Sequence, residues 1–255
     1  MDEAWGPGLE AERVQIEVFT DADQVASKAA DFIAAEAQAA VAARGRFLFA
    51  VSGGRTPWLM LRYLLERTVP WNDTYVLQVD ERVAPAGHPD RNLTHLRESL
   101  LEHSRGLQPG SASSLLRDRL LPMPVNETDL AAAASRYAQE IREIAGSPPV
   151  LDLVHLGLGA DGHTASLLPG DPVLDIDDAD VAVTSVYQDR RRMTLTYPVI
   201  NRSRRILWLV TGDEKAPMLA RLREADPSIP AGRVEQRRAL VLADRPAAEG
   251  PTGAE

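Results

Sequence analysis

A glycine-rich segment at residues 157–170 carries the side chains best suited to acid–base chemistry. His163 is one of five histidines and lies among glycines, where the backbone can approach a ligand closely. Imidazole titrates near neutral pH, which makes histidine the most common general base. Asp161 can orient the ring by a hydrogen bond, and backbone N–H groups near Gly159 can face a developing negative charge. A structural turn with an incidental histidine is the alternative.

A second segment suits the binding of an anion. The sequence Ser-Gly-Gly-Arg-Thr-Pro at 52–57 follows an apolar run and precedes a predicted helix. Its glycines admit a ligand to the backbone, and free N–H groups at a helix N-terminus attract negative charge. The Lys-Ser/Thr ending of a P-loop is missing, and a plain helix-capping turn also fits the sequence. The candidate phosphate contacts are Ser52, Gly53, Gly54, Arg55 and Thr56.

Charged residues follow two further apolar runs. Asp80 and Arg82 come directly after one of them, which suggests Arg82 for a phosphate and Asp80 for a sugar hydroxyl or a proton transfer. A surface cluster of ion pairs is the alternative there. Lys215 stands near the start of a predicted helix, where it suits an anionic ligand, and Arg192 ends an arginine run that begins at Arg190. Both are also consistent with solvated surface positions.

The elements that must position these loops alternate between strand and helix. Helices are expected at about 22–44, 57–65, 93–103, 126–145 and 214–224, with Asp21 and Asn126 as N-caps and Gly45 as a C-terminal stop. Strands are expected at 14–19, 47–51, 75–79, 151–156, 181–186, 193–196, 206–210 and 239–242. This order predicts an α/β fold, a mostly parallel twisted sheet with helices on both faces, which is Rossmann-like. Ligands bind at the carboxyl ends of such strands.

Composition limits the classes of function. The chain has 255 residues, a net charge of −9 and no cysteine. The acidic balance argues against a nucleic-acid partner, and the absence of cysteine removes disulfides and thiol nucleophiles and fits the cytoplasm. No apolar run is long enough to span a membrane. We expect one α/β domain at 13–245, flexible tails at 1–12 and 246–255, and a monomer or weak dimer.

Five segments in order resemble the motifs of the 6-phosphogluconolactonase family. They lie at 52–57, 80–82, 152–170, 192–201 and 211–216, and the resemblance extends over about 14–245. The segment at 152–170 is the most specific, because its residues 157–170 match the family's Gly-x-Gly-x-Asp-Gly-His-Thr-Ala-Ser-Leu-x-Pro-Gly pattern. The chain departs from the pattern at Arg55, Arg91 and Leu168, none of which is the proposed base.

The resemblance implies the reaction and the roles of the site residues. It implies hydrolysis of 6-phospho-D-glucono-1,5-lactone to 6-phosphogluconate in the oxidative pentose phosphate pathway, with a sugar phosphate as substrate and with neither metal nor cofactor. His163 then corresponds to the family's base. The groups that match the family's phosphate contacts are the 52–56 loop, Arg82 and Lys215, with Arg192 as a further candidate.

Two other functions remain open at this point. A glucosamine-6-phosphate isomerase/deaminase shares this kind of fold and needs a ring-opening histidine together with carboxylates, which Asp80 and Glu81 can partly supply. A non-catalytic sugar-phosphate-binding module is the alternative from another class. Such regulators carry a DNA-binding domain, and we expect no room for one before the first strand.

Overall fold

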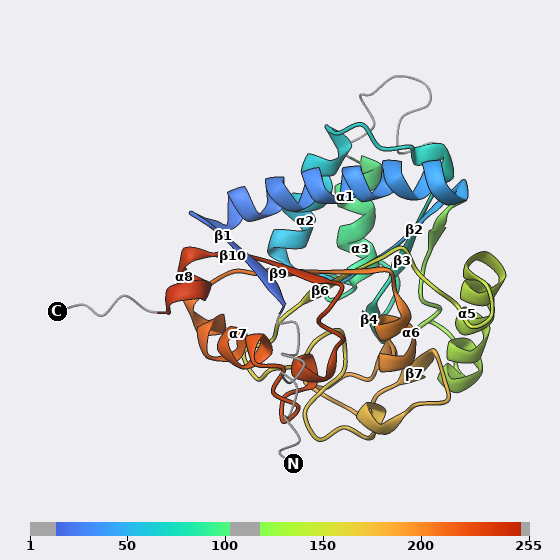
Figure 1. Cartoon of the computed structure of the whole chain (residues 1–255). Helices are drawn as coiled ribbons and strands as arrows, with labels where there is room; N and C mark the ends of the chain where they lie inside the picture. Colours follow the sequence, from blue (N-terminus) through green and yellow to red (C-terminus); the bar gives the residue numbers. More distant parts are fainter. Residues whose placement is uncertain (1–13, 103–117, 251–255) are drawn as a thin grey trace, which may run out of the picture.

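A seven-stranded parallel sheet forms the centre of the molecule, here a computed structural model that describes residues 14–102 and 118–250 (Figure 1). Its strand order is β1-β10-β9-β6-β2-β3-β5, and every pair in it is parallel. The strands are β1 (Gln15–Phe19), β2 (Phe47–Val51), β3 (Thr74–Gln78), β5 (Leu120–Leu121), β6 (Leu153–Gly157), β9 (Arg205–Val210) and β10 (Ala239–Asp244). The predicted fold class is therefore confirmed.

Helices cover both faces of this sheet (Figure 1). On one face lie α1 (Ala22–Arg44), α2 (Arg55–Leu65) and α3 (Asn92–Arg97). On the other lie α5 (Leu130–Ala145), α6 (Tyr197–Arg202) and α7 (Ala216–Arg223). Because apolar side chains point to both faces, the sheet divides the core into two clusters, and all five residues of β2 are buried.

The ends of α1 follow the predicted capping chemistry. Asp21 precedes the helix, and its side chain accepts a hydrogen bond from the Gln24 N–H at 2.9 Å. Gly45 ends the helix with φ 72°, a left-handed conformation that glycine adopts without steric cost. The predicted N-cap of α5 at Asn126 is wrong. Asp129 performs that role, because its carboxylate accepts from the Ala132 N–H at 3.0 Å.

A second sheet of three antiparallel strands was not anticipated by the sequence pattern. It consists of β4 (Asp80–Arg82), β8 (Arg192–Leu195) and β7 (Val181–Val183), in that order. Val79 joins the two sheets through its backbone. Its N–H donates to Val51 O at 3.1 Å in the large sheet, and its carbonyl accepts from Leu195 N at 2.8 Å in the small one.

Several predicted boundaries need correction. The helix expected at 93–103 is α3 followed by a π-helical turn at Glu98–Glu102, and the short strand β5 was missed. The ordered chain continues past the predicted domain end, because Arg245–Glu249 form helix α8. Asp244 caps that helix by accepting from Ala247 N at 2.9 Å. The predicted tail at 1–12 lies outside the described residues.

The order of the strands has a reversal between β2 and β6. The chain builds β2, β3 and β5 toward one edge and then returns to add β6, β9 and β10 toward the other. In open α/β sheets the crevice for ligands lies at such a point, beyond the carboxyl ends of the strands. The loops that follow β2, β3, β6 and β9 are therefore brought to one place, and these are the loops with the predicted site residues.

Candidate active site

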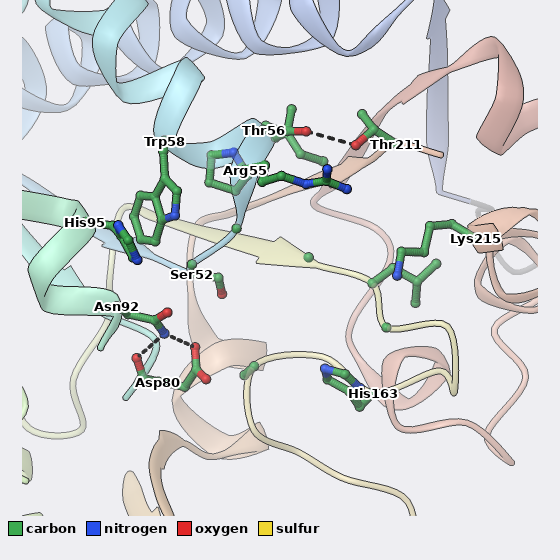
Figure 2. Close-up of a pocket in the computed structure, with 18 of the residues that line it drawn as sticks. Ser52, Arg55, Thr56, Trp58, Asp80, Asn92, His95, His163, Thr211 and Lys215 are labelled. Atoms are coloured by element: carbon green, nitrogen blue, oxygen red, sulfur yellow. Dashed lines mark hydrogen bonds between the residues drawn. The ribbon is translucent and has the colours of Figure 1, made fainter. Parts of the chain in front are cut away.

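One cleft of about 430 Å³ lies beyond those strand ends. Figure 2 shows that the labelled side chains of the Ser52 loop, Asp80, His163 and Lys215 surround the same space. Every predicted site residue except Asp161 lines the cleft. The lining predicted residues are Ser52, Gly53, Gly54, Arg55, Thr56, Asp80, Arg82, Gly159, His163, Arg192 and Lys215. The structure thus brings together four loops that are far apart in the sequence.

Asp161 orients the His163 imidazole by a hydrogen bond to the ring nitrogen Nδ1. Its Nδ1 lies 2.5 Å from Asp161 Oδ1, and the same carboxylate oxygen accepts from the backbone N–H of His163 at 3.1 Å. Because a carboxylate can only accept, Nδ1 carries the proton and Nε2 is left with a free lone pair. The histidine therefore has the tautomer that a general base needs. Asp161 lies behind the ring and does not line the cleft.

Electrostatics at Asp161 agree with this arrangement. Partial burial by itself raises the pKa of the Asp161 carboxyl, but the neighbouring His163 charge and the hydrogen bonds from His163 outweigh it and lower that pKa. The carboxylate is therefore ionised at neutral pH. An ionised Asp161 stabilises the imidazolium that forms when His163 takes a proton.

Gly159 leaves room for the histidine–aspartate pair. A Cβ built there would overlap the imidazole of His163 and the carboxylate of Asp161. The loop is closed by a hydrogen bond from Gly159 N to His163 O at 2.8 Å, and Gly162 adopts a positive φ of 84°. Only glycine fits both requirements, which explains the composition of this loop.

The Ser52 loop presents polar groups without internal partners. Gly54 precedes α2 and supplies no side-chain cap, so the first N–H groups of the helix are available to a ligand. The buried Ser52 hydroxyl has no hydrogen-bond partner within the described residues. A Cβ at Gly53 would overlap the Asn92 side chain, which explains the glycine at this position. These features favour an anion over a plain capping turn.

The loops after β2 and β9 contact each other. Thr56 Oγ1 lies 2.9 Å from Thr211 Oγ1, and both residues line the cleft (Figure 2). Lys215 ends the short 3₁₀ turn Asp213–Lys215 that precedes α7. Its ammonium lies 3.7 Å from a carboxylate oxygen of Glu214, which also lines the cleft. Lys215 and Glu214 therefore form a loose ion pair at this end of the cleft.

The small sheet supplies the other cations. Arg82 of β4 pairs with Arg192 of β8, and both side chains line the cleft. Arg82 donates to Asp90 O at 3.0 Å and to Asn92 Oδ1 at 3.3 Å. The buried Arg192 Nε has no hydrogen-bond partner among residues 14–102 and 118–250, and burial lowers the pKa of this guanidinium. An anion in the cleft would satisfy that group.

Asp80 and Glu81 are neighbours in β4 with different environments. Asp80 lines the cleft and accepts from Ser166 Oγ at 2.7 Å, and burial raises the pKa of its carboxyl. Glu81 is fully buried away from the cleft. Its oxygens accept from the backbone N–H groups of Arg82, Asn92 and Leu93 and from the Gln78 side chain, and its carboxylate lies 3.0 Å from Arg91 Nε. Glu81 therefore anchors the start of α3.

Some lining residues were not among the predicted site residues. Among them are Asn92, which hydrogen-bonds to Arg82 and Asp80, and Trp58, His95 and Thr211. Asn92 follows Arg91 in a loop with no other distinctive pattern, and its role depends on β4 and α3 meeting in space. Within the described residues, no group of three or more His, Cys, Asp or Glu side chains is placed to hold a metal ion.

Comparisons with known proteins identify the family of this chain. The sequence model of glucosamine-6-phosphate isomerases/6-phosphogluconolactonase matches residues 20–242. The chain belongs to this family. A Mycobacterium tuberculosis 6-phosphogluconolactonase is 37% identical over 247 residues, covering 91% of this chain and 96% of the relative. One from Synechocystis is 32% identical over 243 residues, covering 92% and 97%.

Solved structures of the family share the fold. A 6-phosphogluconolactonase from Trypanosoma cruzi has a TM-score of 0.79 at 25% identity, covering 94% of this chain and 98% of that one. A monomeric glucosamine-6-phosphate deaminase has a TM-score of 0.77 at 19% identity, covering 92% and 99%. Because both activities occur on this architecture, the fold alone does not select between them.

Proposed function

We propose that this protein hydrolyses 6-phospho-D-glucono-1,5-lactone to 6-phosphogluconate, with His163 as the general base. The observation that carries the proposal is that a histidine with a free Nε2 and two groups of cations line one cleft. Relatives that cover most of this chain at 32% and 37% identity are named 6-phosphogluconolactonase, which supports the same reaction. A sugar phosphate lactone requires both an anion site and a base.

The proposed reaction begins with attack by water on C1 of the lactone. Nε2 of His163 takes one proton from this water as the new C–O bond forms, and the carbonyl oxygen becomes negative. Collapse of the tetrahedral intermediate breaks the bond from C1 to the ring oxygen, and the imidazolium returns its proton to that oxygen. A positioned general base contributes about 10²–10⁴-fold, and a backbone oxyanion donor contributes about 3–4 kcal/mol.

The cations orient the substrate in this scheme. The free N–H groups at the start of α2, the Ser52 hydroxyl, Arg55 and Lys215 form one group at the carboxyl ends of β2 and β9. Arg82 and Arg192 form a second group on the small sheet. Binding of the phosphate holds C1 of the lactone at a fixed position relative to His163. This orientation accelerates the attack of water without forming any covalent bond to the protein. Asp80 accepts a sugar hydroxyl.

A glucosamine-6-phosphate deaminase is the second candidate. A solved deaminase has the same fold, and the carboxylate of Asp80 lines the cleft. Glu81 weakens this candidate, because its oxygens are occupied at the start of α3 and it does not line the cleft. Only Asp80 of the predicted carboxylate pair faces the substrate space. A deaminase needs carboxylates for proton transfer between carbons, whereas a lactonase does not.

A coupled assay tests the choice. The purified protein is given freshly made 6-phosphogluconolactone with 6-phosphogluconate dehydrogenase, and the spontaneous reaction is subtracted. It is also given glucosamine 6-phosphate with ammonia detection. We expect lactone hydrolysis and no ammonia. Ammonia release without lactone hydrolysis would make it a deaminase, and binding of 6-phosphogluconate with neither activity would make it a non-catalytic module.

Location and assembly remain proposals as well. No helix within the described residues has the length and apolar character to cross a membrane. We propose a cytoplasmic protein, which the cysteine-free sequence fits, and a monomer or weak dimer. Cell fractionation and light scattering over a range of concentrations test these two statements.

A further inference from the structure

A tight hairpin connects β7 and β8 and extends to the loop that carries the proposed general base, His163. Tyr187 and Arg190 exchange backbone hydrogen bonds of 2.8 and 3.2 Å across it. The two residues of the turn, Gln188 and Asp189, both have positive φ, at 50° and 62°. Two-residue turns of this kind match the twist of the flanking strands and fix their register. The position of the Tyr187 side chain is therefore set by the turn.

Tyr187 is in contact with the part of Asp161 that His163 does not use. Its hydroxyl donates to Asp161 Oδ2 at 3.2 Å, whereas His163 Nδ1 contacts Oδ1. The tyrosine ring also meets the imidazole edge-on, with ring centroids 6.4 Å apart. The two carboxylate oxygens thus have separate partners, and both partners fix the plane of the carboxylate.

The Tyr187 ring also contacts an arginine that lines the cleft. The Arg192 guanidinium lies 5.0 Å from the ring centroid, within the range of a cation–π contact. Gln188, the next residue of the hairpin, accepts a hydrogen bond from Arg192 at 3.2 Å. One aromatic ring therefore contacts both the proposed base and an arginine of the cleft.

We propose that Tyr187 is a positioning residue, which holds Asp161 in line with His163 through its hydroxyl and holds Arg192 in the cleft through its ring. This inference rests on the proposed function, because it assigns Tyr187 a role in activating the same base. Asp161 is partly exposed on a glycine-rich loop, where a carboxylate with one free oxygen can turn toward solvent. The tyrosine hydroxyl replaces that solvent with a fixed donor.

The protonation state of the tyrosine agrees with a donor role. Burial and the adjacent Asp161 carboxylate raise the pKa of the Tyr187 hydroxyl. The hydroxyl therefore keeps its proton at the pH at which the enzyme works. Its neighbour Val186 lies on the same hairpin with its side chain exposed to solvent, so it provides a matched control.

Three variants separate the two roles. Tyr187→Phe keeps the ring and loses the hydroxyl, so we expect kcat to fall about tenfold while KM changes less than about twofold. Tyr187→Leu also loses the ring, so we expect a similar kcat and a KM raised a further two- to fivefold. Val186→Ala should have wild-type kcat and KM. Thermal unfolding of each variant checks that the fold is intact.

A double-mutant cycle tests whether Tyr187 works through Asp161. If it does, Tyr187→Phe has no further effect on kcat in an Asp161→Asn background. Unchanged kcat in the single Tyr187→Phe variant, or an equal loss in both backgrounds, would overturn the inference. The outcome is separable from the proposed function. If His163→Asn removes activity but Tyr187→Phe does not, only the role of Tyr187 fails.

Discussion

Arg82 lies directly opposite Arg192 in the β4–β8 pair, and both guanidinium groups face the same cleft. Like charges directly opposite in an antiparallel pair are destabilising, so this arrangement needs a compensating anion. Asp80 supplies one negative charge between them only when it is ionised, and burial raises the pKa of Asp80. This arrangement supports the proposal that the ligand of the cleft is an anion such as a phosphate.

Removal of one of these arginines should weaken substrate binding. We expect Arg192→Gln to lower kcat/KM about 10- to 100-fold, because a charge-assisted hydrogen bond contributes about 1.5–3 kcal/mol. Thermal shift with 6-phosphogluconate provides a second measurement, and the stabilisation by this product should be largely lost.

Arg67→Gln is the matched control for the loss of one positive charge. Arg67, just beyond the end of α2, forms an ion pair with Asp31 of α1, and neither residue lines the cleft. We expect this variant to retain wild-type kinetics. An equal loss in both variants would show that net charge, and not a contact in the cleft, is responsible.

Replacement of the proposed base should affect turnover more than binding. We expect His163→Asn to lower kcat about 10²–10⁴-fold with KM within a few-fold of wild type. Steady-state kinetics with the spontaneous hydrolysis subtracted measures this. A variant that folds normally and turns over at the wild-type rate would remove His163 from the mechanism.

Gly159→Ala should disrupt the same site by sterics. A Cβ at Gly159 would overlap the His163 ring and the Asp161 carboxylate, so the pair must move. We expect kcat to fall about 10²-fold, because misplacement by about 1 Å has this effect. Gly157→Ala is the comparison. No atom in the described part of the chain lies within 4 Å of a Cβ there, but Gly157 lines the cleft, so we expect its effect mainly on KM and a far smaller fall in kcat. Similar losses in both would point to general loss of glycine flexibility.

A buried histidine predicts how stability depends on pH. His155 is fully buried, its Nδ1 accepts from Ser52 N at 3.2 Å, and burial lowers its pKa to about 3. In the unfolded chain this histidine has its ordinary pKa of about 6.5. The contribution of the neutral, buried His155 to the free energy of unfolding is therefore complete above that pH and declines as the pH falls toward 3. Between pH 7 and pH 5 we expect the free energy of unfolding to fall by about 2 kcal/mol.

His155→Asn tests this linkage, because the asparagine oxygen can still accept from Ser52 N. Urea unfolding at pH 7 and pH 5 gives the free energies for both proteins. We expect the wild type to lose about 2 kcal/mol more than the variant between these two pH values. Parallel losses in the two proteins would mean that His155 does not titrate on unfolding.

The location of the site followed from the sequence because of a general property of parallel sheets. Ser52, Asp80, His163 and Lys215 each follow a predicted strand, and the carboxyl ends of parallel strands share an edge. No pairing between particular strands had to be known. The strand-by-strand alternation with helices was sufficient to bring these loops together.

Features that depend on contacts between distant segments did not follow from the sequence. Glu81 looks like Asp80 in the sequence, but the two are neighbours in β4 and their side chains point to opposite faces, so Glu81 meets the start of α3 instead of the cleft. Tyr187 reaches Asp161 only because β7 and β8 pair in a separate sheet. The cap of α5 was misplaced by three residues, because Asn126 and Asp129 have similar capping propensity.

The backbone of Val79 has a consequence for substrate choice. Val79 is hydrogen-bonded to the large sheet through its N–H and to the small sheet through its carbonyl. Neither sheet can therefore shift relative to the other without breaking one of these backbone hydrogen bonds. The span between the cations of the small sheet and the helix start after β2 is therefore fixed by main chain. A shorter or longer sugar phosphate held by these groups would place its reacting carbon away from His163 Nε2, and we expect it to be hydrolysed poorly.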